Sequence, residues 1–263
     1  MTNYKTKKRF GQHFLNDFSV IEKLVYEINP NTDDQIVEIG PGLGALTFPL
    51  LEKLDALNVV EIDRDVIARL KQKEERKLII HGVDALKFDF SSLRKNNKPL
   101  RIVGNLPYNI STPLIFHLLE FKDNISDMHF MLQNEVVKRI TAEPNTKAYG
   151  RLSVMVQYHC KTEYLFFVGP ESFDPPPKVD SAIVKLSPWQ NQTIKANNEK
   201  TLSGLVAKSF SMRRKTLRNN LKKVLSAEQI ESAGIDPSQR AESLQVSDFV
   251  KLSNLITQSL DQD

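Results

Sequence analysis

The stretch QIVEIGPGLGALTFPLLEKL (35–54) decides the fold, because it joins a strand pattern to a helix pattern through a glycine-rich turn. The run QIVEIG (35–40) is short, apolar and closed by glycine, which is typical of a buried strand. GALTFPLLEKL (44–54) spaces its apolar residues as a helix does. A strand, a glycine-rich turn and a helix in this order open many α/β folds that bind a nucleotide-like ligand.

The chain that follows alternates strand and helix patterns. Helix-like segments separate four further apolar, strand-like runs, at 57–63, 77–82, 100–105 and 127–133. Such alternation favours an α/β fold with a doubly wound, mostly parallel sheet and helices on both of its faces.

The next part of the chain is less regular. SVMVQYHC (153–160) fits a helix or a strand, whereas YLFFVG (164–169) and SAIVKLS (181–187) fit strands. GPESFDPPPK (169–178) excludes regular structure, since three successive prolines remove backbone donors. From residue 189 the sequence is polar and then helical throughout, which predicts a first domain at 1–188 and a small all-helical domain at 189–263.

Length and composition exclude several classes of protein. The chain has 263 residues, of which 40% are hydrophobic and 26% charged, as in ordinary globular proteins. A largely disordered chain, a collagen and a disulfide-dense secreted peptide are therefore excluded. The lone Cys160 rules out an internal disulfide and favours a reducing compartment. No apolar run approaches the roughly 20 residues that span a bilayer, so we expect no membrane partner and a cytoplasmic location.

Positive charge is concentrated in two places. The net charge is +4 and the isoelectric point is about 9.0. Residues 5–9 carry Lys and Arg without an acid. The segment 208–223, here called the basic segment, has no acid and contains Lys208, Arg213, Arg214, Lys215, Arg218, Lys222 and Lys223. Clusters of one sign indicate a polyanion partner, although solvated helix faces remain an alternative.

Within the basic segment, the spacing of three cations predicts a geometry. Arg214, Arg218 and Lys222 are four residues apart, so a continuous helix would align them in one stripe. A phosphate backbone along the stripe would relieve their mutual repulsion. We therefore expect this segment to contact a polyanion through a helical face.

The glycine turn predicts a cofactor. Gly40 and Gly42 fit the dinucleotide pattern, and Glu61 follows about 20 residues later, where it can accept hydrogen bonds from ribose hydroxyls. Pro41 has no N–H to give a pyrophosphate, which favours S-adenosylmethionine over NAD. Asp84 follows the third strand and can accept from an adenine amino group. The alternatives are a tight turn without a ligand and, for Asp84, a helix N-cap.

A second motif, NLPY (105–108), falls at the carboxyl end of the fourth predicted strand, where ligands of doubly wound sheets react. The Asn105 side-chain oxygen and the Leu106 carbonyl can accept both hydrogens of an exocyclic amine and so aim its lone pair at a methyl group. Pro107 stiffens the turn, and Tyr108 offers a face on which a base stacks. The alternative is an Asn-Pro turn with a packed tyrosine.

A third motif is the proline loop FDPPPK (173–178). Its stiffness would let Phe173 close over the second face of the base. The alternative is a simple connector.

Together the motifs resemble a known family. GQHFL (11–15), EIGPG (38–42), NLPY with the following NIST, and FDPPPKVDSA (173–182) are similar to the ribosomal RNA adenine N6-dimethyltransferases over nearly the whole chain. SMRRKTLRNNL (211–221), GIDP (234–237) and RAE (240–242) resemble the bacterial small-subunit (16S) branch of that family rather than the macrolide-resistance enzymes.

The resemblance implies a Rossmann-like methyltransferase domain and a helical RNA-binding domain. It implies dimethylation of two adjacent adenosines in a hairpin near the 3′ end of 16S rRNA, within the small subunit or its precursor. It places the contacts to S-adenosylmethionine on His13, Leu15, Gly40, Glu61, Asp84 and Asn105. His13 departs from the family, where many relatives carry asparagine, and its ring would replace the amide donor in only one tautomer.

If the polyanion is RNA, as the resemblance implies, the charge of the basic segment places RNA contacts on Arg213, Arg214, Lys215, Arg218, Lys222 and Lys223. The five histidines are scattered, so we predict no metal site. No general base is evident, and a monomer is the default expectation.

Two alternative functions remain at this level. An NAD-dependent oxidoreductase would share the fold, but that function would not explain the NLPY motif or the basic segment. A non-catalytic RNA-binding or ribosome-assembly factor would keep both and lose only the chemistry.

Overall fold

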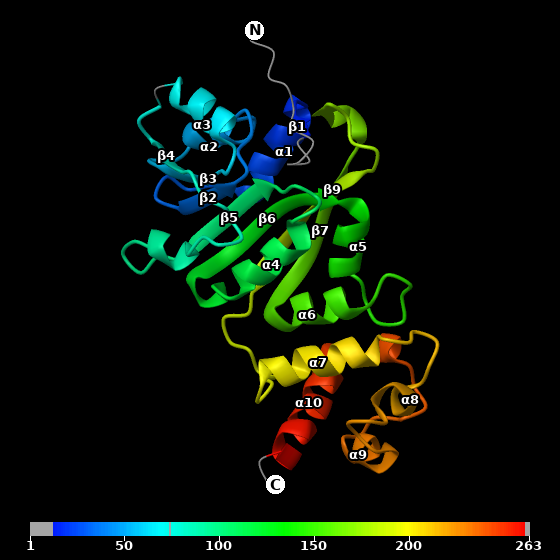
Figure 1. Ribbon diagram of the computed structural model, residues 1–263. Coiled ribbons are helices and arrows are strands. Elements are labelled where there is room, and N and C mark those ends of the chain that lie inside the picture. Colours follow the sequence, from blue (N-terminus) through cyan, green and yellow to red (C-terminus); the bar gives the residue numbers. More distant parts are fainter. Residues whose placement is uncertain (1–12, 74, 261–263) are drawn as a thin grey trace. The chain divides into compact units, whose positions relative to one another are not determined.

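The computed structural model describes residues 13–73 and 75–260 (Figure 1), so the basic residues 5–9 lie outside the described residues. The chain forms two compact units. The first comprises the chain up to Val137 together with Lys161–Pro188, and the second comprises Lys138–Cys160 together with the chain from Trp189 onward. We expected 189–263 alone for the second domain, and the unit takes in residues 138–160 as well.

The first unit contains most of a seven-stranded sheet with the order β4-β3-β2-β5-β6-β9-β7. The strands are β2 (Gln35–Ile39), β3 (Leu57–Val60), β4 (Leu78–His81), β5 (Leu100–Asn105), β6 (Ile125–Gln133), β7 (Cys160–Val168) and β9 (Ser181–Pro188). The pairs from β4 to β6 are parallel, and β6 pairs with β9 antiparallel. The predicted mostly parallel, doubly wound sheet is confirmed, and its chain order reverses between β2 and β5.

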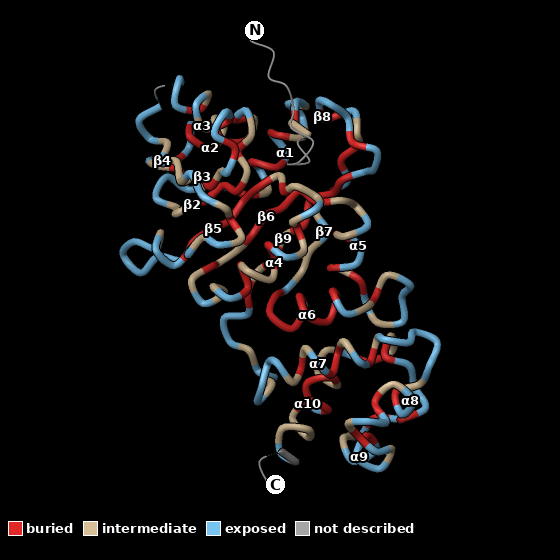
Figure 2. Tube along the Cα trace, in the orientation of Figure 1, coloured by how far each residue is buried: buried red, intermediate tan, exposed pale blue. Residues whose placement is uncertain are grey.

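Helices cover the sheet because their apolar faces match the alternating apolar faces of the strands. They are α1 (Phe18–Ile28), α2 (Thr47–Leu51), α3 (Arg64–Lys71), α4 (Ser111–Leu119) and α5 (Asn134–Ile140). Asp17 caps α1 by accepting from the backbone of Ser19 and Val20. The buried face of α1 packs with α2 on one side of the sheet, and α4 lies on the other side (Figure 1). Buried residues follow the strands between these layers (Figure 2).

The proline loop contains more structure than its sequence predicts. A short 3-10 turn (Pro170–Ser172) leads into β8 (Phe173–Asp174), which pairs antiparallel with β1 (Phe14–Leu15). The expectation that 169–178 contains no regular structure is therefore wrong at these residues. The donors that prolines lack are not needed there, because the three prolines follow β8.

The second unit is helical. Its helices are α6 (Arg151–His159), α7 (Glu199–Ser209), α8 (Leu217–Leu221), α9 (Ala227–Ser232) and α10 (Val246–Leu260). The ambiguous segment 153–160 is mostly helix, and α6 is buried along most of its length (Figure 2), where it packs with α7 and α10. Trp189 donates its backbone N–H to the His159 carbonyl and its indole N–H to the Gln157 carbonyl. These contacts explain why 138–160 belongs with the C-terminal helices.

The basic segment is not one helix. α7 ends at Ser209, residues 211–215 form turns, and α8 begins only at Leu217. Arg214 therefore lies in a turn, and the predicted stripe of Arg214, Arg218 and Lys222 along one helix is wrong.

None of the helices in the described part of the chain is long and apolar enough to cross a bilayer.

Candidate active site

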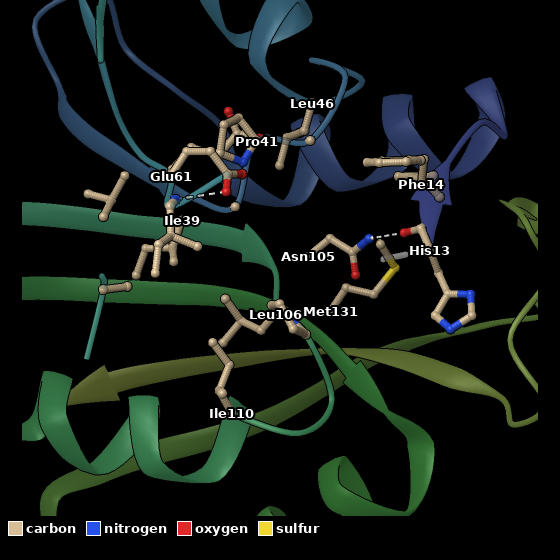
Figure 3. Close-up of a pocket in the computed structure, with 18 of the residues that line it drawn as sticks. His13, Phe14, Ile39, Pro41, Leu46, Glu61, Asn105, Leu106, Ile110 and Met131 are labelled. Carbon is tan, nitrogen blue, oxygen red and sulfur yellow. Dashed lines mark hydrogen bonds between the residues drawn. The ribbon is translucent and has the colours of Figure 1, made fainter. Parts of the chain in front are cut away.

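A cavity of about 280 Å³ opens at the carboxyl ends of β2, β3 and β5 (Figure 3). This is where the chain order of the sheet reverses, and where doubly wound sheets bind ligands. The structure brings together here nearly all the residues predicted to bind the cofactor and the target base: His13, Leu15, Gly40, Gly42, Glu61, Asp84, Asn105, Leu106, Pro107 and Tyr108.

The glycine turn forms one wall of the cavity through its backbone. Gly40 and Gly42 have φ angles of 69° and 54°, in the left-handed region that glycine tolerates best. A Cβ atom on Gly42 would lie 2.9 Å from the ring of Phe14, so no side chain fits there without displacement. The turn thus presents bare backbone to a ligand.

Two carboxylates are fixed at the edge of the cavity. Oε1 of Glu61 accepts from the backbone N–H groups of Ile62 at 2.8 Å and Asp63 at 2.7 Å. Oδ1 of Asp84 accepts from the N–H of Leu86 at 3.0 Å. Asp84 therefore stabilises a local turn rather than the helix N-terminus that its alternative interpretation proposed, and it also lines the cavity. Both carboxylates are thus held as hydrogen-bond acceptors at the edge of the cavity.

Glu38 lines the same cavity and was not predicted as a site residue. It is 2% exposed, and the Thr47 hydroxyl donates to its Oε2 at 2.6 Å. Burial raises the pKa of Glu38 to about 7; the Thr47 hydrogen bond opposes this rise, and the nearby charge of Glu61 contributes to it. The only sequence signal was its place immediately before the glycine turn. The structure adds that this carboxyl is close to its titration point at neutral pH.

Asn105, the last residue of β5, is held in one orientation. Its Nδ2 donates to the backbone carbonyl of His13 at 3.1 Å (Figure 3). A carbonyl oxygen only accepts, so this contact assigns the two ends of the amide and leaves Oδ1 as the end that accepts from a ligand. The backbone N–H of Leu106 donates to the carbonyl of Met131 at 3.2 Å, which fixes the next peptide. The two predicted amine acceptors are thus pre-positioned.

Tyr108 is held at two points. Its hydroxyl lies 2.6 Å from Oγ of Ser181, which is fully buried at the start of β9, and burial raises the pKa of the Tyr108 phenol. Its ring is stacked with the ring of His13, with centroids 6.0 Å apart and planes at 24°. Ser181 is a second residue that sequence reasoning missed, because it acts only through its contact with Tyr108.

His13 has a different set of contacts from the one expected. Its Nδ1 lies 2.8 Å from the carbonyl oxygen of Pro175, so Nδ1 carries a hydrogen and donates. Nε2 is therefore the only ring nitrogen of His13 left for the predicted contact to the cofactor. The His13 backbone, by contrast, orients Asn105.

Phe173 does not reach the cavity. It is 3% exposed and packs in the core, because the pairing of β8 with β1 places it opposite Leu15. The expected role of Phe173 as the second face of a base slot therefore needs correction: in this arrangement its ring stabilises the core.

The predicted RNA-binding residues divide into two groups. Arg214, Lys215, Arg218, Lys222 and Lys223 are exposed with the basic segment. Arg213 is exposed too, but it also donates from Nε to Oε2 of Glu242 at 3.1 Å and from Nη2 to the carbonyl of Lys147. Among the described residues, no group of three or more His, Cys, Asp or Glu side chains could hold a metal ion.

Comparisons with known proteins agree with this geometry. The family model described as ribosomal RNA adenine dimethylase matches residues 3–258. A curated protein named ribosomal RNA small subunit methyltransferase A, from Alcanivorax borkumensis, is 56% identical over 97% of this chain and 91% of its own. The protein of the same name from Acinetobacter baylyi is 57% identical over 95% and 92%.

Solved structures give the same result. A dimethyladenosine transferase from Plasmodium falciparum superimposes with a TM-score of 0.78 and 28% identity over 91% of this chain and 96% of its own. The 23S rRNA methyltransferase ErmE, at 22% identity, superimposes with a TM-score of 0.72 over 93% and 99%, which supports the fold. With a family match over almost its full length and a glycine-walled cavity at the sheet reversal, the chain belongs to the ribosomal RNA adenine dimethylase family.

Proposed function

We propose that this protein dimethylates N6 of two adjacent adenosines in a hairpin near the 3′ end of 16S rRNA, within the small ribosomal subunit or its precursor. Family membership supports the reaction, and the small-subunit names of close relatives support the RNA. The observation that carries the chemistry is the fixed amide of Asn105, whose Oδ1 is left to accept from an amine. An NAD-dependent oxidoreductase has no use for that arrangement.

The cavity residues fit S-adenosylmethionine. The turn around Pro41 offers close backbone approach without a full set of N–H donors, which suits a ligand that has no phosphate. Glu61 and Asp84 supply fixed acceptors for the ribose and the adenine of a nucleoside. When bound, this cofactor supplies a methyl group on a sulfonium, which is an excellent leaving group.

The protein's own contribution is orientation. Asn105 Oδ1 and the Leu106 carbonyl accept the amine hydrogens and so fix the direction of the nitrogen lone pair. Tyr108 holds the base by its face, and Ser181 and His13 fix the angle of that ring. Alignment of this kind accounts for large rate factors without a general base.

The second unit supplies affinity for RNA. The exposed cations of the basic segment suit a phosphate backbone, whose contacts dominate nucleic-acid affinity. We propose that the protein acts as a monomer in the cytoplasm, where its ribosomal substrate would lie.

Transfer of tritium from labelled S-adenosylmethionine tests the proposal. The protein should label 30S particles that lack the modification, with naked 16S rRNA as the comparison substrate, and nuclease digestion should release N6-dimethyladenosine. Binding to 30S particles without any label would instead favour a non-catalytic assembly factor. Label on neither substrate would contradict the proposed reaction.

A further inference from the structure

Arg213 differs from the other cations of the basic segment in its contacts. Its guanidinium donates from Nε to Glu242, and from Nη2 to the carbonyls of Lys147 and Tyr149, the latter at 3.4 Å. A guanidinium carries its donors in a rigid fork, so one side chain can hold several acceptors in fixed positions. Arg213 is therefore occupied with the protein itself.

The segment that Arg213 holds is the loop 141–150, which connects α5 to α6. This loop is also attached to residues 242–244. The N–H of Asn145 donates to the carbonyl of Glu242 at 2.7 Å, and the Tyr149 hydroxyl donates to the carbonyl of Leu244 at 2.9 Å. Two segments that are distant in sequence thus lie together at the turn 211–215, within the second unit (Figure 1).

The attached segment carries the same sign of charge as the basic segment. Residues 138–160 contain four cations and one acid, Glu143. Two of the cations, Lys147 and Arg151, flank the Tyr149 carbonyl that Arg213 holds, and both are exposed. Glu242, an acid at the junction, is already paired with Arg213. The loop therefore extends the positive surface.

We propose that Lys147 and Arg151 contact RNA phosphates as part of one surface with the basic segment, and that Arg213 is the positioning residue that holds the loop in place. This inference rests on the proposed RNA substrate. It reassigns Arg213 from a phosphate contact to an internal anchor. It also adds to the RNA-binding surface two residues that are more than 50 positions away in the sequence.

The first test is the salt dependence of binding to 30S particles. Each phosphate contact contributes about one unit to the slope of log affinity against log salt. Lys147→Gln and Arg151→Gln should each lower the slope by about that amount. The control is Lys71→Gln at the end of α3, an exposed lysine outside the second unit, which should leave the slope unchanged. Slopes for Lys147→Gln and Arg151→Gln equal to that of the wild type would overturn the inference.

The second test separates charge from position. Arg213→Lys keeps the charge and removes the fork, so tryptic cleavage after Lys147 in the free protein should accelerate several-fold. Binding to 30S particles should weaken several-fold and the slope should fall, although no charge is removed. Arg76→Lys, at an exposed arginine that also lies in a turn but belongs to the first unit, is the matched control and should change neither. Glu242→Gln breaks the same ion pair from the other side and should reproduce the faster cleavage.

The combination of variants gives the sharpest outcome. If Arg213 acts through the loop, Arg213→Lys should add little to a Lys147→Gln, Arg151→Gln double variant. Full additivity would mean that Arg213 contacts RNA directly, which contradicts the inference. Failure of the wild-type protein to bind 30S particles would count against the proposed function itself, whereas tryptic cleavage of the free protein tests the anchor independently of RNA.

Discussion

The cavity edge and the basic surface, which is formed by the exposed cations of the basic segment 208–223, are built in opposite ways. At the cavity, backbone geometry and part-buried hydrogen bonds fix each group, as for Asn105 against the His13 carbonyl and Tyr108 against Ser181. On the basic surface, most cations are exposed and lie on turns and one short helix. The cavity therefore depends on position, which one substitution destroys. The surface depends on summed charge, which each substitution reduces only in part.

Asn105→Ala should produce the largest effect. It removes one of two amine acceptors and the amide that contacts the His13 carbonyl, so the lone pair of the amine turns away from the methyl group. A misplacement near 1 Å costs about a hundredfold in rate. We expect at least that loss in single-turnover methylation at saturating cofactor, with affinity for 30S particles within a few fold of wild type. A normal methylation rate would contradict the contrast between the two regions, because the cavity would then tolerate a misplaced amine.

Glu38→Gln tests how strongly the cavity constrains a buried carboxyl, because it changes the pH dependence of stability. The folded-state pKa of Glu38 is about 7, above its ordinary value of 4.5, so the folded protein holds this proton more tightly than the unfolded chain. The stability that the protonated carboxyl contributes is present below about pH 4.5 and is lost as pH rises through 7. The glutamine keeps an acceptor for Thr47 and carries no charge. The free energy of unfolding of the variant should therefore exceed that of the wild type by up to about 3 kcal/mol at pH 8, and by little at pH 5.

Denaturant titrations of both proteins at the two pH values measure this difference. A gain of equal size at pH 5 and pH 8 would show that Glu38 does not titrate in this range.

Glu61→Ala should weaken S-adenosylmethionine binding by about tenfold or more. Hydrogen bonds to a charged acceptor contribute roughly 1.5–3 kcal/mol, and Glu61 is held in place by two backbone donors. Calorimetry on the folded variant measures the effect, with thermal unfolding as the control for structure. Unchanged affinity would remove Glu61 from the site.

The basic surface should show the smallest effect per residue. Replacing Arg214, Arg218 and Lys222 together with glutamine should lower the salt slope of 30S binding by about three units, or about one for each cation replaced. Single replacements should each weaken binding by only a few fold. Methylation of a free adenosine analogue, if measurable, should remain the same. A single replacement that abolished binding would show that this surface also depends on exact placement.

Local features of the chain account for the predictions that succeeded. The strands were predictable because buried strands read as apolar runs, and the glycine turn because positive φ angles require glycine. Both are properties of a few neighbouring residues. The same holds for the capping box that begins α9, because its two residues, Ser226 and Gln229, are only three positions apart.

The errors share a different cause. Phe173 is in the core because β8 pairs with β1, about 160 residues away. The stripe in the basic segment fails because the chain turns at 211–215, where Arg213 contacts distant residues. Glu38 acquires its pKa from burial. Nothing in the local pattern of these residues indicates their long-range partners.

The sequence by itself thus determined the succession of the main strands along the chain, the glycine turn, the acceptors at the strand ends and the charge of the basic segment. Short-range periodicity and residue chemistry specify all of these. Only the tertiary structure decided which ends meet at the cavity, how the Asn105 amide is oriented, and that residues 138–160 join the second unit. Those features depend on interactions between residues far apart in the chain, whose energies come from packing and pairing rather than from local pattern.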